Sequence, residues 1–206
     1  APTDNERNVK SNWLVNERGR SNLARTFSKV YDCTVDGNVI TVKGSLAGVG
    51  KDPYLYHTTT YTFSGDGRVT IRLEAEIAAW FVAPPAPIPG LPAEFAGFAP
   101  KAAFLPRLGF ETQLPGEDEA FSYFGMGPEE NYCDMHLHTA LDCYESTASA
   151  EYVPYVMPQE HGNHTNSRAL WFERGLCVES NESFEFNVSQ YSTDMLADTA
   201  HEAALR

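Results

Sequence analysis

Alternation of apolar and polar side chains is the clearest pattern in this chain. Residues 68–77 read RVTIRLEAEI, in which every second side chain is apolar and those between are charged or polar. A period of two places the two kinds of side chain on opposite faces of an extended strand. This segment is therefore predicted to be an amphipathic β-strand with one face toward a core.

Two β-hairpins are predicted in the first eighty residues. In residues 28–48, apolar and β-branched runs flank a turn at Gly37 and Asn38. In residues 54–78, the strand just described follows a tyrosine- and threonine-rich strand across the sequence SGDG. Glycine and asparagine adopt the turn conformations that join antiparallel strands, so both pairs are expected to be antiparallel.

The rest of the chain continues the β pattern, with helices only near the two ends. Residues 12–27 predict a short helix and a loop, because Gly19 interrupts the helical spacing. Near the other end, Ser192 is a candidate N-cap for a helix. Further strands are predicted within residues 104–114, 121–127, 151–174 and 183–192. The fold class is therefore all-β and antiparallel, as one domain over residues 1–206 with short peripheral helices.

A proline-rich stretch interrupts the strands at residues 83–100. Proline lacks the backbone donor that a central strand or a helix interior needs, so a loop is expected here. Its apolar side chains, Ile88, Leu91, Phe95 and Phe98, leave two interpretations open. It is either a surface loop or a loop that docks on another part of the protein.

Composition says more about which classes of partner to expect than about the fold. The 206 residues carry 28 acidic and 15 basic side chains, for a net charge of −13. Such a surface repels phosphate backbones and anionic lipids, so neither nucleic acid nor membrane is an expected partner. The four cysteines are widely spaced and are expected to be buried, reduced thiols, with a Cys133–Cys143 disulfide left open.

The segment GMGPEENYCDMHLH, residues 125–138, gathers residues that often carry chemistry. His136 and His138 would share one face of a strand, with Cys133 just upstream and His161 and His164 as further ligands. The segment has neither of the paired CxxC or HxxxH elements typical of zinc sites, so no metal is expected. Acids are abundant, but spacing alone places no pair of carboxylates across a cleft, as glycoside hydrolysis requires. No catalytic residues are predicted in this chain.

Five ordered segments carry a resemblance to a known family. They are APTDN (1–5), LPRLGF (105–110), FSYFGMGPEENYCD (121–134), YVPYVMPQEHGNHTNSRALWF (152–172) and FEFNVSQYSTDMLADTAH (184–201). Together they resemble the C-terminal small-chain domain, domain 5, of the large bacterial β-galactosidases in the second glycoside hydrolase family. Two departures are Met135, where the family usually has Arg or Lys, and Cys133, where it often has Pro.

The resemblance implies a galactose-mutarotase-like supersandwich, in which two large antiparallel sheets pack face to face. It also implies that residues 83–100 are an insertion and that the chain is a domain truncated at both ends. Thr3, Asp4 and Asn5 would form a loop near the sugar site. The motif residues expected to have structural roles, with Asn131 and Tyr132 tying loops together, are Gly127, Pro128, Glu130, Asn131, Tyr132, Asp134, Pro154, Tyr155, Pro158, Glu160, Gly162 and Arg168.

The same resemblance implies a function for a larger parent protein. The parent would be a retaining hydrolase of terminal β-D-galactosides, with its catalytic glutamates and Mg²⁺ in a separate barrel domain. This chain would be inactive, without a cofactor, and would pack against the parent's other domains, with galactoside bound through the parent's active site. A homo-oligomer and a cytoplasmic location are expected, although a periplasmic or secreted parent stays open.

Two alternatives belong to other classes of protein. A free-standing carbohydrate-binding module on a mutarotase-like fold would stack sugars on aromatic side chains such as Tyr152, Tyr155, Trp171 and Phe172. An aldose epimerase would use a His and a Glu, here His161 and Glu160. Adjacent residues of a strand point to opposite faces, which ranks the epimerase last.

Overall fold

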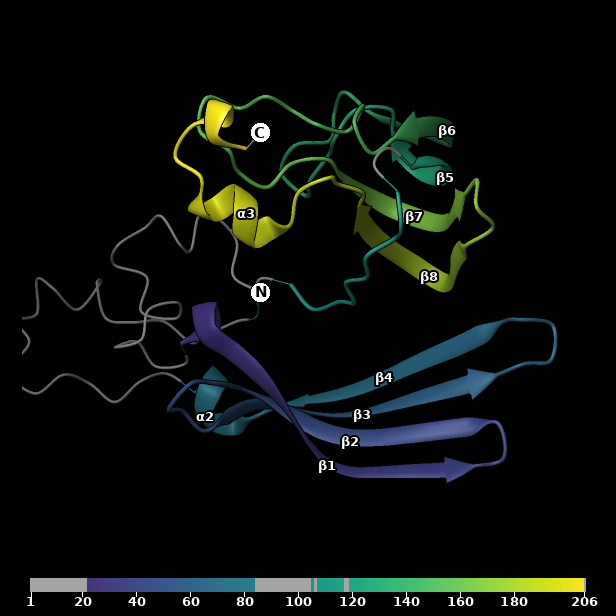
Figure 1. The fold of residues 1–206 in the computed structure, drawn as a ribbon, viewed down its shortest axis with the longest axis vertical. Coiled ribbons are helices and arrows are strands. Elements are labelled where there is room, and N and C mark those ends of the chain that lie inside the picture. Colours follow the sequence, from purple (N-terminus) through teal and green to yellow (C-terminus); the bar gives the residue numbers. More distant parts are fainter. Residues whose placement is uncertain (1–21, 84–104, 106, 117–118, 206) are drawn as a thin grey trace, which may run out of the picture. The chain divides into compact units, whose positions relative to one another are not determined.

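The computed structural model describes residues 22–83, 105, 107–116 and 119–205 of the chain. It consists mostly of antiparallel β-sheet with a few short helices, which confirms the predicted fold class (Figure 1). No helix in these ranges is long and apolar enough to cross a membrane. The chain divides into two compact units, Ala1–Phe110 and Glu111–Arg206. The single domain and the face-to-face packing of its sheets stay predictions.

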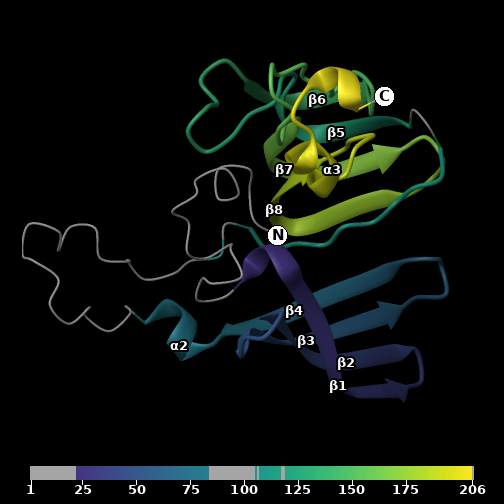
Figure 2. The same ribbon diagram turned by 60° about the vertical axis from the view of Figure 1, so that its left-hand side comes forward.

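The first unit contains a four-stranded antiparallel meander. Its strands run side by side in chain order (Figure 2). A 3₁₀ turn, η1, precedes the sheet, and a short helix, α2, follows it. The elements are η1 (Leu23–Arg25), β1 (Thr26–Asp36), β2 (Val39–Gly48), β3 (Pro53–Phe63), β4 (Val69–Ile77) and α2 (Ala79–Val82).

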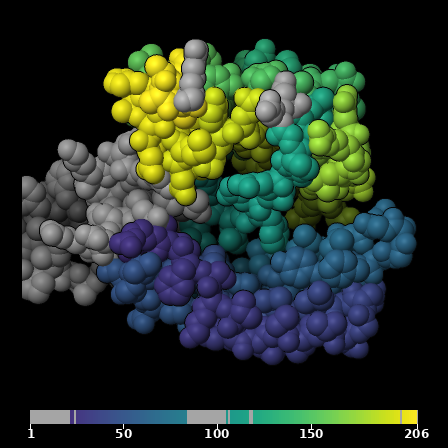
Figure 3. Space-filling view, viewed as in Figure 1, coloured from purple at the N-terminus to yellow at the C-terminus, as the bar shows by residue number. Residues whose placement is uncertain are grey.

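Both predicted hairpins are confirmed. Asp36 pairs with Val39 across the first turn, where Gly37 has a φ of 56° that disfavours side chains larger than hydrogen. The alternation in the sequence of β4 is not matched by an alternation in burial. Leu73 is the only half-buried residue of that strand, and the other eight are exposed. All eleven residues of β1 are likewise exposed, and their side chains lie at the surface (Figure 3).

The buried core of this unit lies at one end of its sheet. Leu55 and Phe81 are at most 1% exposed, and they cluster with Leu23 and Tyr54. Trp80 packs on this cluster, and its indole N–H donates to the Pro53 carbonyl at 2.9 Å. Burying one such side chain stabilises a fold by about 1.5–3 kcal/mol, which explains why α2 turns back onto the sheet.

The second unit contains another four-stranded antiparallel sheet, in the order β6-β5-β7-β8. Two short helical elements follow the sheet. The elements are β5 (Ala120–Gly127), β6 (Ala140–Thr147), β7 (Asn163–Phe172), β8 (Cys177–Asn187), α3 (Thr193–Asp198) and η3 (Glu202–Ala204).

An aromatic cluster forms the core of this second unit. Tyr123 is fully buried and packs with Phe121, Leu170, Phe172 and Phe186. Alternate residues of β5 supply Phe121 and Tyr123, in agreement with the period of two. The apolar run that predicted this strand therefore also identified the centre of the core.

The predicted C-terminal helix is confirmed as α3. The Ser192 hydroxyl accepts the backbone N–H of Met195 at 3.2 Å, as expected for an N-cap. The predicted helix near the other end falls mostly on residues 12–21, and the proline-rich loop falls mostly on residues 84–100. Both segments lie outside the described residues.

Other features of the structure differ from what the sequence predicted. The described part of residues 104–114 contains no strand. Strand β6 was not predicted, because its sequence ALDCYEST lacks a strong apolar alternation. The four cysteines, Cys33, Cys133, Cys143 and Cys177, are exposed rather than buried, and none of them forms a disulfide.

Candidate functional site

The candidate site is built around Asn131, in the turn that follows β5. Its side chain is fully buried and makes four hydrogen bonds. The amide nitrogen donates to the carbonyls of Met126 at 2.9 Å and Glu129 at 3.1 Å. The amide oxygen accepts the backbone N–H of Thr165 at 2.8 Å and its hydroxyl at 2.6 Å. An asparagine amide can donate two hydrogens and accept two, so this side chain is fully satisfied.

The backbone of Asn131 is also paired, with the start of β7. Its N–H donates to the carbonyl of Asn163 at 2.7 Å, and its carbonyl accepts from the Asn163 side-chain amide at 2.9 Å. The Asn163 amide donates to Glu185 on β8 as well, at 3.0 Å. These contacts hold the turn, β7 and β8 together.

Glu130 makes a second link between distant segments. One oxygen of its carboxylate accepts the hydroxyl of Tyr155, and the other accepts the backbone N–H of Gly162 at 2.8 Å. The hydrogen bond to the carboxylate, together with burial, raises the pKa of Tyr155 from 10.0 to about 12. Gly162 has a φ of 72°, a conformation that favours glycine.

Tyr132 is less well satisfied than its neighbours. Its phenol oxygen is buried and makes no hydrogen bond of ordinary geometry with the described residues. Burial raises the pKa of this phenol, and so do the nearby carboxylates of Glu130 and Glu160, whereas the backbone of Asn163 opposes them. The phenol therefore stays neutral over the ordinary pH range.

Some of the other predicted motif residues make hydrogen bonds near Asn131, and others lie at the surface. Gly127 ends β5, and the following Pro128 accepts the Tyr123 hydroxyl at 3.4 Å through its carbonyl. Arg168 donates to the carbonyl of Asn181 on β8 at 2.9 Å and is exposed. Pro158 is buried, whereas Asp134 and Pro154 are exposed. Thr3, Asp4 and Asn5 lie outside the described residues.

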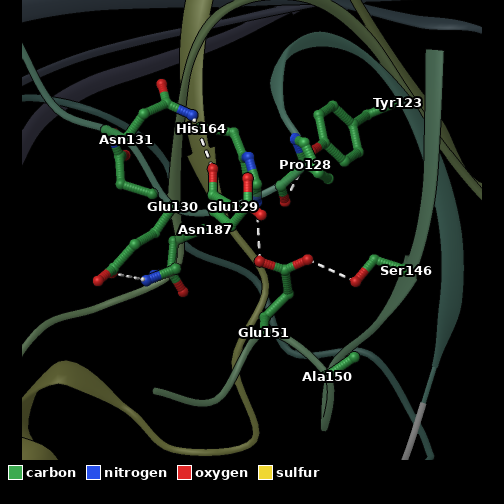
Figure 4. Close-up of polar contacts among 12 residues, drawn as sticks. Tyr123, Pro128, Glu129, Glu130, Asn131, Ser146, Ala150, Glu151, His164 and Asn187 are labelled. Carbon is green, nitrogen blue, oxygen red and sulfur yellow. Dashed lines mark hydrogen bonds and ion pairs between the residues drawn. The ribbon is translucent and has the colours of Figure 1, made fainter. Parts of the chain in front are cut away.

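A buried pair, His164 and Glu151, was not predicted as a unit. The His164 Nε2 lies 2.7 Å from Oε2 of Glu151 (Figure 4). The Nδ1 atom lies 3.1 Å from the carbonyl oxygen of Met126. The other Glu151 oxygen accepts the Ser146 hydroxyl. Thirteen residues separate the pair in sequence, so no local motif could have revealed it.

The four histidines considered as metal ligands each contact a different partner. His136 and His138 are exposed and face the carbonyl oxygens of Tyr132 and Glu130. His161 is buried, with its ring against Tyr152, and His164 is committed to Glu151. Within the described ranges, no three His, Cys, Asp or Glu side chains come together as a metal site.

Two hollows lie on the described residues, one on each unit. A hollow of about 250 Å³ on the second unit is lined by Phe124, Met126, Leu141, Asn166, Arg168 and Ser183. A hollow of about 110 Å³ on the first unit is lined by Leu23, Thr26, Leu46, Tyr54, Leu105, Arg107, Leu108 and Gly109. Neither described lining contains a carboxylate, so neither offers the acid pair of a glycoside hydrolase.

The aromatic residues proposed for sugar stacking are mostly engaged. Phe172 belongs to the core, and Tyr152 packs against His161 and Tyr191. Tyr155 is held by Glu130. Of the four, Trp171 is the most open, at 40% exposed. One exposed indole is a weak platform for a sugar-binding module.

Comparison with known proteins agrees with the sequence motifs. The family model described as "Beta galactosidase small chain" matches residues 1–206. A "Beta-galactosidase" of Actinobacillus pleuropneumoniae is 26% identical over 201 residues, which cover 98% of this chain and 18% of that protein. A "Beta-galactosidase" of Staphylococcus xylosus is 27% identical over 214 residues, covering 100% of this chain and 19% of that protein. The chain thus spans less than a fifth of the length of these curated relatives.

Proposed function

Because the chain belongs to the β-galactosidase small-chain family, we propose that it is a non-catalytic structural domain of a β-galactosidase. The parent would hydrolyse terminal β-D-galactosides with retention, using carboxylates and Mg²⁺ held in its catalytic domain. The names of both relatives support the activity of the parent, and the share of their length that this chain covers leaves room for a separate catalytic domain.

The observation that carries the non-catalytic role is the hydrogen bonding of two acids, the half-buried Glu130 and the buried Glu151. Both oxygens of Glu130 and both oxygens of Glu151 accept hydrogen bonds from within the second unit. A general acid or nucleophile must instead present an oxygen to a substrate. The motif that gathers acids, asparagine and tyrosine therefore organises loops, and the domain would present those loops to the parent's other domains.

The direct test is an assay of the purified 206-residue chain on a chromogenic β-galactoside. We expect no turnover above a mock purification. Turnover that disappears when one acid of this chain is replaced by its amide, as in Glu130→Gln, would contradict the proposal. A second assay uses the full-length parent, in which Glu130→Gln should lower the amount of assembled enzyme and leave kcat per folded active site close to that of the wild type.

A further inference from the structure

The larger hollow, of about 250 Å³, is lined by residues from all four strands of the second sheet. Phe124 and Met126 come from β5, Leu141 from β6, Asn166 and Arg168 from β7, and Ser183 from β8. On β5, the half-buried Phe124 and Met126 alternate with buried residues such as Tyr123, whose ring belongs to the aromatic core. Successive side chains of a strand point to opposite faces, so the hollow lies on the face of the sheet opposite that core.

An irregular register between β7 and β8 supplies the polar side of the hollow. Residues 180–183 of β8 lie opposite the single residue Arg168 of β7, because the register shifts between Ser167 and Ala169. Asn166 has a φ of 53°, a left-handed conformation that asparagine tolerates better than most residues. Bulges of this kind redirect side chains and are frequent beside functional sites.

The polar side chains of the hollow retain donors for a ligand. Nη1 of Arg168 donates to the Asn181 carbonyl at 2.9 Å, and a guanidinium has several further N–H donors. Within the described part of the chain, Arg168 makes no ion pair. The Asn166 amide and the Ser183 hydroxyl make no hydrogen bond to any described residue. One cation and two neutral polar groups therefore border the same hollow.

The other side of the hollow is apolar. Met126 and Leu141 pair across β5 and β6, and Leu141 is 55% exposed. Small-molecule sites typically combine an apolar lining with a few polar groups that fix the orientation of the ligand. A planar guanidinium matches a carboxylate, with which it can form two parallel hydrogen bonds. Although the chain has a net charge of −13, no carboxylate lines this hollow, so a ligand's carboxylate meets no like charge there.

We propose that this hollow binds a small carboxylic acid with an apolar body. Arg168 holds the carboxylate, the apolar residues of β5 and β6 contact the body, and Asn166 and Ser183 offer further hydrogen bonds. Ligand pockets usually begin near ~300 Å³, so a volume of about 250 Å³ fits a ligand of the size of 3-phenylpropionate. A neutral sugar would leave the charge of Arg168 unused. The site is therefore independent of the galactoside site proposed for the parent.

The test titrates the wild-type chain, with ¹³C-labelled methionine methyl groups, with 3-phenylpropionate and with 3-phenylpropanamide, a neutral ligand of the same shape. We expect the acid to bind with a dissociation constant of about 1 mM, as is usual for so small a ligand. The amide should bind about tenfold more weakly, because it lacks the charge that strengthens the contact with Arg168. The methyl signal of Met126 should shift, whereas that of Met195 on α3 should not. Equal affinity for acid and amide, or an unshifted Met126, would overturn the proposal.

Arg168→Gln is the discriminating variant. Glutamine can still donate to the Asn181 carbonyl but carries no charge, so the preference for acid over amide should disappear. Arg72→Gln, at an exposed position of the other unit, is the matched control and should keep the preference. A preference unchanged in Arg168→Gln would overturn the proposal, and the wild-type comparison of the two ligands decides it even if this variant does not fold. Binding to the 206-residue chain that is absent in the full-length parent would also overturn it, because another domain would then cover the hollow.

Discussion

The side-chain oxygen of Asn131 holds both polar hydrogens of Thr165, a residue thirty-four positions later in the chain. The acceptor is buried, and both distances are at most 2.8 Å. Because the same amide also donates to the turn after β5, one side chain fixes the spacing between that turn and β7. The turn would otherwise leave several backbone groups buried without partners.

Replacing Asn131 by alanine should therefore destabilise the second unit. The change leaves the N–H and the hydroxyl of the buried Thr165 without this acceptor, at a cost of about 1–3 kcal/mol for each group. We expect the free energy of unfolding to decrease by about 3 kcal/mol, measured by urea denaturation. Asn181→Ala, at an exposed position of β8, is the control and should change it by less than about 0.5 kcal/mol. Equal effects of the two changes would mean that the network contributes little.

A second prediction concerns the contact between Gly125 and Ser167. A Cβ atom on Gly125 would lie 2.2 Å from the Ser167 hydroxyl oxygen and 3.1 Å from its Cα, and Ser167 is fully buried. Gly125→Ala should lower the free energy of unfolding by about 1–3 kcal/mol, the usual cost of overpacking. Adding Ser167→Gly removes the closest atoms and should recover part of this loss. Gly65→Ala, where a Cβ meets nothing within 4 Å, is the control. A double variant no more stable than Gly125→Ala would exclude this contact as the cause.

The sequence predicted the strands better than it predicted the contacts between them. Alternation and turn residues were sufficient for the hairpin β1–β2 and for β5, because the period of a strand is a local property. Strand β6 escaped detection because its sequence, ALDCYEST, lacks a strong apolar alternation. Cys143, which lies on that strand, is exposed.

The network of the candidate site could be predicted only in part. The motifs drew attention to Glu130, Asn131 and Tyr155, but the bond between Glu130 and Tyr155 spans twenty-five residues. His164 and Glu151 were hidden for a similar reason, since sheet pairing brings them together. Hydrogen bonds between distant segments depend on strand register, which single-sequence patterns do not determine.

The N-cap of α3 allows a local test of stability. Ser192→Ala removes the acceptor of the Met195 N–H and should lower the free energy of unfolding of this helix by about 1 kcal/mol. The loss should appear as faster amide hydrogen exchange in residues 193–198. Ser192→Asn keeps an N-cap acceptor and should exchange at close to the wild-type rate. Unchanged exchange in the alanine variant would show that packing, and not the cap, holds the helix.

The last prediction concerns the Tyr155 phenol, whose pKa is raised from 10.0 to about 12. The Glu130 carboxylate accepts the phenol hydrogen and so favours the protonated form, as does burial. Since the folded pKa is the higher one, this contribution to stability is complete below about pH 10 and is lost as the pH rises toward 12. The titration can be followed by the ring ¹³C signal of labelled tyrosine.

Glu130→Gln should move that titration toward the ordinary value of 10.0, because an amide oxygen accepts the same hydrogen without a negative charge. Burial remains, so some elevation of the pKa should persist. Tyr54, whose pKa is raised by burial on the other unit, supplies a tyrosine whose titration should not respond to the substitution. If Tyr155 titrates at the same pH in wild type and variant, its elevated pKa comes from burial and not from Glu130. The link between the two motifs would then be weaker than the geometry indicates.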